Sequence, residues 1–299
     1  MPRLLQCWLK IFAVVLIVTF ATVVAVRLAH AGETPAAQRS PLAQAAESAF
    51  FGVFNGGEPK DRSAALYPLM AAFATGPDDA RVNLLLGLNH LWMAAEGDRT
   101  NPRIIEDLVL AERFLSRAQE LNPADGRIPS WLVPVRSSLA RIERRPGRQD
   151  ELDKELLAAY EKDPDFHSFS VALFGFASPR DSREFQRGLE ALRRTGGCGE
   201  TNPSCQNRPH WPHNREAFIT FHADYELKAG HADRAAGLLR IAQAEPDFPA
   251  WPFRGQVEER LKDLEAYGKL FADEDPKNDP PSLMSLEGGI ACQSCHRGR

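Results

Sequence analysis

The clearest pattern along the chain is a set of apolar residues at steps of four and three, followed five residues later by a proline. Three segments keep these spacings unchanged, and a fourth carries its proline one place early. The four sets are Ala65, Leu69, Ala72 and Pro77; Ala111, Leu115, Ala118 and Pro123; Leu152, Leu156, Ala159 and Pro164; and Ala235, Leu239, Ala242 and Pro246. Steps of four and three place side chains on one face of a helix, and proline ends the helix soon afterwards. The pattern therefore predicts four helices whose small residues let a neighbouring helix approach closely.

A second amphipathic stretch follows these prolines, as in residues 80–92. Leu86-Gly87 and Leu132-Val133 stand at equivalent distances after Pro77 and Pro123. Each unit is therefore predicted to be two helices joined by a turn. No convincing alternation of apolar and polar residues appears in the sequence, so strands are not expected. The predicted fold class is all-α.

These units resemble the tetratricopeptide repeat, a helix–turn–helix unit of about 34 residues whose second helix carries the pattern A-x3-F-x2-A-x4-P. The resemblance extends over residues 42–272 and implies a helical-repeat array. Successive prolines lie 46, 41 and 82 residues apart, so the units are longer than the standard one. The last interval indicates a degenerate repeat between Asp181 and Asn214. The alternative is an irregular all-α domain whose alanine-rich helices match by chance.

Residues 1–31 have the layout of an export signal. Basic residues up to Lys10 precede an uncharged apolar run, residues 11–26, and a small-x-small site ends at Ala31. Such a signal peptide directs secretion and is cleaved, here after Ala31. The run is also close to the length of a membrane span, so a retained N-terminal anchor that tethers the protein to the membrane is the alternative. In both cases the rest of the chain is expected in the periplasm or otherwise exported, because Lys10 keeps the N-terminus in the cytoplasm.

Composition bears on partners and on the cysteines. The 299-residue chain carries a net charge of −4 and has a pI near 6.1, which gives no electrostatic reason to expect nucleic acid as a partner. Export would place the cysteines where disulfides persist. Cys198 and Cys205 flank the turn-rich sequence GETNPS, which can bring their Cα atoms within disulfide reach. We expect these two residues to form a disulfide, and a redox-active pair is the alternative.

The most specific motif is CQSCH, formed by Cys292, Gln293, Ser294, Cys295 and His296. Two thiols at this spacing can add to the two vinyl groups of one haem, and the adjacent histidine then reaches the iron. A thioredoxin-like pair would need a βαβ context, which the sequence lacks. A zinc site would need a further ligand from a distant part of the chain, and a plain disulfide would leave His296 without a role. The motif therefore predicts one covalently bound haem c, with His296 as an axial ligand of the iron.

Over these five residues alone the chain resembles c-type cytochromes, and the resemblance implies electron transfer. In the common small cytochromes the motif lies near the N-terminus, whereas here only Arg297, Gly298 and Arg299 follow it. Residues 273–299 read as an extended haem-attachment tail because they are rich in proline and glycine and lack apolar periodicity. The haem is therefore expected to be covered by preceding residues or by a partner, or left partly exposed.

The sequence leaves the sixth iron ligand open. His210 and His213 flank Trp211-Pro212 in a non-helical insertion that can fold over a cofactor, and Met284 lies close to the motif. Four further candidates lie on apolar helical stretches, where core packing is expected instead: His90, His222, Met70 and Met93. His167 and His231 complete the candidates, and an open or water-bound iron is the alternative.

Together these features predict an exported monohaem c-type cytochrome that transfers electrons, with the helical repeats as a docking platform for a protein partner. The alternative is a haem-bearing interaction, sensor or assembly factor of the periplasm. A haem enzyme such as a peroxidase is a third hypothesis. No phosphate-binding glycine loop, nucleophile elbow or His-Glu-x-x-His helix occurs in the sequence, so an electron carrier is favoured over a catalyst.

Overall fold

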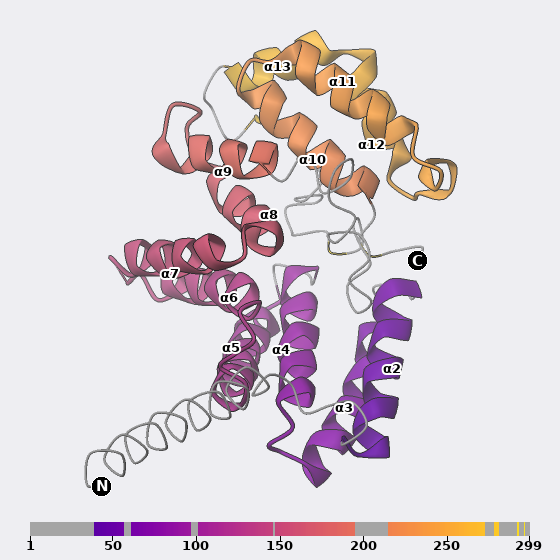
Figure 1. Cartoon of the computed structure of the whole chain (residues 1–299), viewed down its shortest axis with the longest axis vertical. Coiled ribbons are helices and arrows are strands. Elements are labelled where there is room, and N and C mark those ends of the chain that lie inside the picture. The colour runs from indigo at the N-terminus through magenta and orange to yellow at the C-terminus, as the bar shows by residue number, and fades with distance from the viewer. Residues whose placement is uncertain are drawn as a thin grey trace, which may run out of the picture.

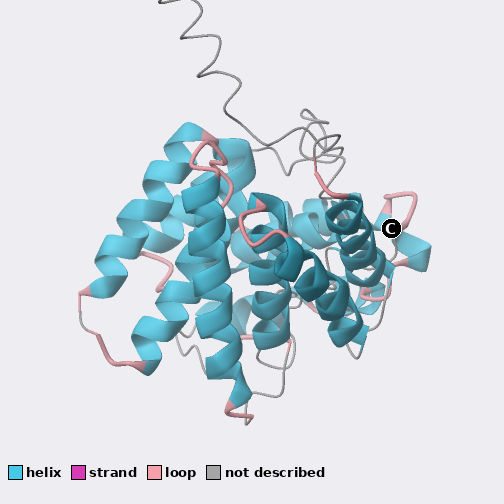
Figure 2. Cartoon of the chain, turned by 90° about the horizontal axis from the view of Figure 1, so that it is seen from below, coloured by secondary structure: helices cyan, strands magenta, loops and turns pink. Residues whose placement is uncertain are grey.

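A computed structural model describes residues 39–56, 61–96, 101–145, 147–194, 215–272 and 278–280, together with Cys292 and His296. Throughout these residues the secondary structure is helical and no strand occurs, as Figure 2 shows. The helices are α2 (Pro41–Gly56), α3 (Arg62–Thr75), α4 (Ala80–Ala95), α5 (Arg103–Leu121), α6 (Pro129–Ile142), α7 (Arg148–Lys162), α8 (Pro164–Gly175), α9 (Arg183–Arg194), α10 (Arg215–Lys228), α11 (Ala232–Gln243), the 3-10 helix η4 (Phe248–Ala250), α12 (Arg254–Lys262) and α13 (Leu264–Ala272).

Consecutive helices pack against one another along the chain, in the pairs α2/α3, α4/α5, α6/α7, α8/α9 and α10/α11. Figure 1 shows these pairs following an arc, from α2 and α3 at the lower right to α11 and α13 at the top. The predicted all-α fold is confirmed, and the packing of successive helices is that of a helical-repeat array.

The residues of the predicted repeat form the contacts between helices. All of its alanines and leucines are buried, and they lie on α3, α5, α7 and α11. These helices end two or three residues before the prolines of the pattern, because a residue that precedes proline is disfavoured in helical conformation. The sequence pattern thus predicts both the buried face and the end of these four helices, each the second helix of its pair.

Helix α9 accounts for the long interval between the last two prolines. Phe185, Leu189 and Leu192 keep the steps of four and three, and all three are buried. Large side chains here replace the alanines of the other copies, which is why the residues escape the small-residue pattern. Of the segment between Asp181 and Asn214, where a degenerate repeat is expected, the structure describes α9, which pairs with the preceding α8, while residues 195–214 lie outside the described part of the chain.

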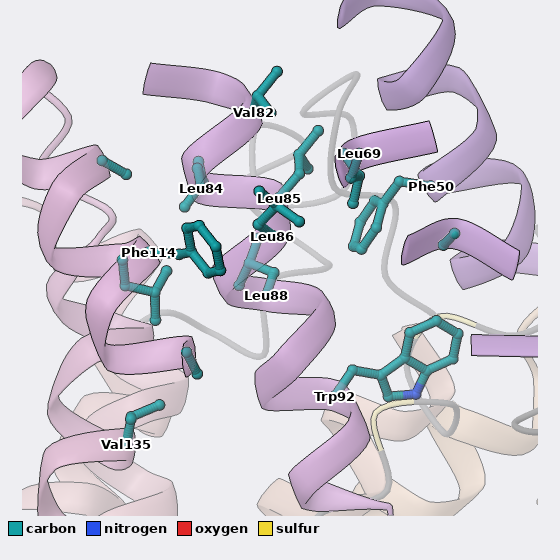
Figure 3. Close-up of a cluster of buried hydrophobic side chains, with 14 of the residues drawn as sticks. Phe50, Leu69, Val82, Leu84, Leu85, Leu86, Leu88, Trp92, Phe114 and Val135 are labelled. Atoms are coloured by element: carbon teal, nitrogen blue, oxygen red, sulfur yellow. The ribbon is translucent and has the colours of Figure 1, made fainter. Parts of the chain in front are cut away.

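The core follows the array rather than forming a single centre. One apolar cluster joins α2 to α6, and Figure 3 shows Phe50, Leu69 and Leu85 facing one another within it. A second cluster joins α8 to α13. A smaller one, which includes Val133 and Leu156, connects the two through α6, α7 and α8. Each helix pair is therefore stabilised mainly by its neighbours.

Among the described helices none is long and apolar enough to cross a membrane. The predicted signal peptide or anchor, residues 1–31, lies outside the described residues.

The closest approach of α4 and α5 depends on a glycine. A Cβ atom added to Gly87 would lie 2.6 Å from Leu115 Cγ and 3.0 Å from the Leu115 backbone nitrogen. We expect Gly87→Ala to lower the free energy of unfolding by about 1–3 kcal/mol, because the backbone of α5 has to move. Urea denaturation measures this change.

Gly52→Ala is the matched control, because a Cβ at this helical position meets nothing within 4 Å. Replacing an exposed helical glycine by alanine should stabilise the protein by about 0.5–1 kcal/mol. Equal stability of the two variants would show that α4 and α5 are not packed as closely as described.

Candidate haem-attachment site

Two residues of the CQSCH motif are described, and both lie against the N-terminal part of the array. Cys292 is half-buried and packs on the apolar cluster of α2–α6, and His296 is 9% exposed. Both have helical backbone conformation. Residues 293–295, Cys295 among them, lie outside the described residues.

His296 stands at the end of a row of aromatic rings. The centroid of its imidazole lies 4.3 Å from that of the Phe54 ring, with the two planes at 43°. Phe54 in turn stacks on Phe50 at 5.3 Å and meets Trp92 edge to face at 4.8 Å. Phe50, Phe54 and Trp92 are all buried, so the row leads from the motif into the core.

The row exists because α2 and α4 present their last turns side by side. Phe50 and Phe54 are four residues apart and so share one face of α2. Trp92 lies in the last turn of α4, where its Nε1–H donates a hydrogen bond of 2.8 Å to Glu96 Oε2. Carbonyl groups at a helix C-terminus carry partial negative charge. This charge and the Glu96 carboxylate favour a cation beside these turns.

A second contact fixes the tail far from the motif. Lys228 Nζ, on α10, lies 2.9 Å from Asp279 Oδ2, and both side chains are largely buried. The same ammonium lies 5.2 Å from the centroid of the Phe176 ring, and Pro280 is buried as well. The tail is thus held by α10 in the C-terminal half of the array before Cys292 reaches the N-terminal half.

These residues fit a covalently attached haem. A thiol and an imidazole are the donors that the motif needs, and the aromatic rings around them suit an apolar macrocycle. Among the described residues, no group of three or more histidine, cysteine, aspartate or glutamate side chains is arranged to hold a metal ion.

The described histidines outside the motif have other partners. His90 Nδ1 lies 2.8 Å from Asp107 Oδ1, and the ring stacks on Phe114. Both nitrogens of His167 are engaged, with Ser130 Oγ at 2.6 Å and the Gly126 carbonyl oxygen at 2.8 Å. His167 could therefore bind the iron only by losing a buried hydrogen bond, whereas the contact of His90 uses Nδ1 and would be compatible with iron binding through Nε2.

The other candidates for the sixth ligand differ in how far their side chains are exposed. His222 is buried, as expected, whereas Met70 is 43% exposed on α3, so the expectation that it packs in the core is wrong. Met93 Sδ accepts a hydrogen bond of 3.4 Å from Asn89 Nδ2 on the same helix. The remaining predicted residues lie outside the described part of the chain: His210, His213, Met284, and the proposed disulfide partners Cys198 and Cys205.

No pattern in the sequence indicates the buried ionic cluster around Glu226 on α10. Burial by itself would raise the pKa of the Glu226 carboxyl group. Two hydrogen bonds of 2.7 Å from Arg193, with His222 and His231 close by, outweigh burial and hold that pKa well below its ordinary value. His231 is thereby assigned to this cluster, where its Nδ1 lies 2.8 Å from Glu226 Oε2.

No protein-family model, curated protein or solved structure matches the chain.

The Glu226 cluster makes stability depend on pH. A carboxyl group whose pKa is lowered by folding stabilises the native state above its unfolded pKa, near 4.3, and this contribution is lost as the pH falls towards the folded value. We expect Glu226→Gln to lower the free energy of unfolding by about 1–3 kcal/mol at pH 7. The difference from the unmodified protein should shrink between pH 5 and pH 3.

Urea denaturation at several pH values measures this difference. Glu120→Gln is the control, because Glu120 forms an exposed ion pair with Arg117 and such pairs contribute little. A deficit for Glu226→Gln that stays constant from pH 7 to pH 3 would contradict the assignment.

Proposed function

We propose that the chain is an exported monohaem c-type cytochrome that transfers electrons and uses its helical array to dock a protein partner. Cys292 and Cys295 would hold the haem, and His296 would be the axial ligand. The observation that carries this proposal is the burial of the motif's imidazole against Phe54, at the end of the aromatic row. A histidine without a ligand role would gain little from being fixed there.

A bound haem supplies a one-electron redox change at its iron. The residues of the chain supply the attachment and the environment. Phe54, itself packed on Trp92, covers one side of His296, and a dry environment would favour the less charged, reduced state. Cys292 is only half-buried, so the site extends from the core towards the surface, where a partner protein can approach.

Export is part of the proposal, because haem attachment at such a motif and a Cys198–Cys205 disulfide both suit an oxidising compartment. Residues 11–26 would serve as a signal peptide core or as a membrane tether. A carrier role is preferred to a sensor or assembly role because an aromatic, water-poor site suits rapid electron transfer. A peroxidase would in addition need an acid–base group beside an open iron face.

Covalent attachment is tested by purifying the exported protein from a host that attaches haem to such motifs. We expect one haem per chain that survives denaturation, seen by haem staining and by intact mass. Cys292→Ser and Cys295→Ser should each remove the thioether at the substituted position. Ser294→Ala, which changes the motif at a position without a ligand role, is the control. A matured protein with no covalent haem would rule out the proposal.

The aromatic row predicts a change in reduction potential. Phe54→Leu should lower the potential, because water gains access to the iron ligand and favours the oxidised state. Potentiometric titration with optical detection measures this. Phe51→Leu is the matched control. Phe51 lies on the same helix and contacts Phe50, whereas the ring contact of His296 is with Phe54. An equal potential in the Phe54→Leu variant and the unmodified protein would show that the row does not border the iron.

A further inference from the structure

Helix α3 has an exposed face without charge. Residues 63–77 include no Asp, Glu, Lys or Arg. The exposed side chains of α3 within this stretch are Ser63, Ala64, Tyr67, Met70, Ala71, Ala74 and Thr75, with Tyr67 75% and Met70 43% exposed. The corresponding helix of the next pair, α5, exposes Glu106, Arg113 and Glu120. An apolar helix face of this kind, in an array whose other second helices are charged, indicates a surface that another molecule covers.

The exposed residues of α3 are arranged symmetrically by size. Ala64, Tyr67, Ala71 and Ala74 follow one another at steps of three, four and three, so they form one stripe along the helix. If two such helices cross antiparallel about a two-fold axis level with Leu69, Tyr67 of one meets Ala71 of the other. In the same register Ala64 meets Ala74. A large side chain then enters the space above a small one in both directions, which is the requirement for an isologous contact.

Charge favours a second copy over other occupants. A two-fold axis brings like residues close together, and a face without charge does so without repulsion. A helix that lies on a membrane surface usually carries several Lys or Arg beside its apolar face, whereas α3 has only Arg62, its first residue. Figure 1 shows α3 in the helix pair that forms one end of the arc.

We propose that two copies of the chain associate through the exposed faces of α3, antiparallel about a two-fold axis level with Leu69. The contact uses α3 alone and includes neither Cys292 nor His296. The dimer would thus carry two separate haem-attachment sites, and its formation does not depend on haem.

Sedimentation velocity over a range of concentrations tests the proposal, with the full chain and with a chain that begins at Gly32. Both should sediment as dimers. Ala71→Glu should weaken the association by roughly tenfold or more, because the carboxylate would be buried beneath Tyr67 of the other copy. Val109→Glu is the control, since Val109 is 49% exposed on α5 and should leave the dimer intact.

The proposal is overturned if the protein is monomeric at all concentrations, whether or not it sediments with lipid vesicles. It is also overturned if only the full chain dimerises, which would assign the association to residues 1–31. A dimer that survives Ala71→Glu, or one that Val109→Glu disrupts, would place the contact elsewhere. Tyr67→Lys is the second variant, and it should give the same loss as Ala71→Glu.

Discussion

The contact between His296 and Phe54 connects the two ends of the described chain, and the proposed function depends on it. A histidine close to the C-terminus is buried against the first helix of the array, so the whole of the intervening chain is closed into a loop. Closing a loop of this length costs conformational entropy, although the cost grows slowly with length. The array lowers this entropic cost, because its helices are already ordered by their neighbours. The tail then needs to be fixed at only a few points.

The curvature of the array and the Lys228–Asp279 ion pair provide those points. Helix pairs that pack mainly on their neighbours follow an arc, and Figure 1 shows both ends of the arc on the same side of the molecule. Lys228 holds the tail in the C-terminal half, where the Phe176 ring and burial strengthen the ion pair. Cys292 and His296 then pack on the N-terminal half. Both halves of the array therefore contribute to the position of the CQSCH motif.

Local pattern was sufficient to predict the helices, and it failed where a distant contact decides the outcome. Ala111, Leu115 and Ala118 signal a buried face because period and residue size are local properties. Helix α9 was harder to recognise, since Leu192 stands where every other copy has alanine and Phe185 where three of the four have it. Met70 lies on an apolar stretch and is nevertheless exposed, because periodicity does not show which face of an uncharged helix the neighbours cover. The motif itself predicts the thiols and the imidazole, whereas the partnership of Phe54, Trp92 and His296 joins three helical segments that only the fold brings together.

The central proposal is that a haem iron bound at the motif would lie beside the last turns of α2 and α4. Comparing NMR spectra of the oxidised and reduced protein, with the Phe54 ring and the Trp92 indole N–H assigned, tests this most directly, because a paramagnetic iron shifts only nearby protons. The account predicts redox-dependent shifts for both residues and none for Trp251, which lies in the C-terminal cluster. Unshifted Phe54 and Trp92 signals, with shifts elsewhere in the array, would contradict it.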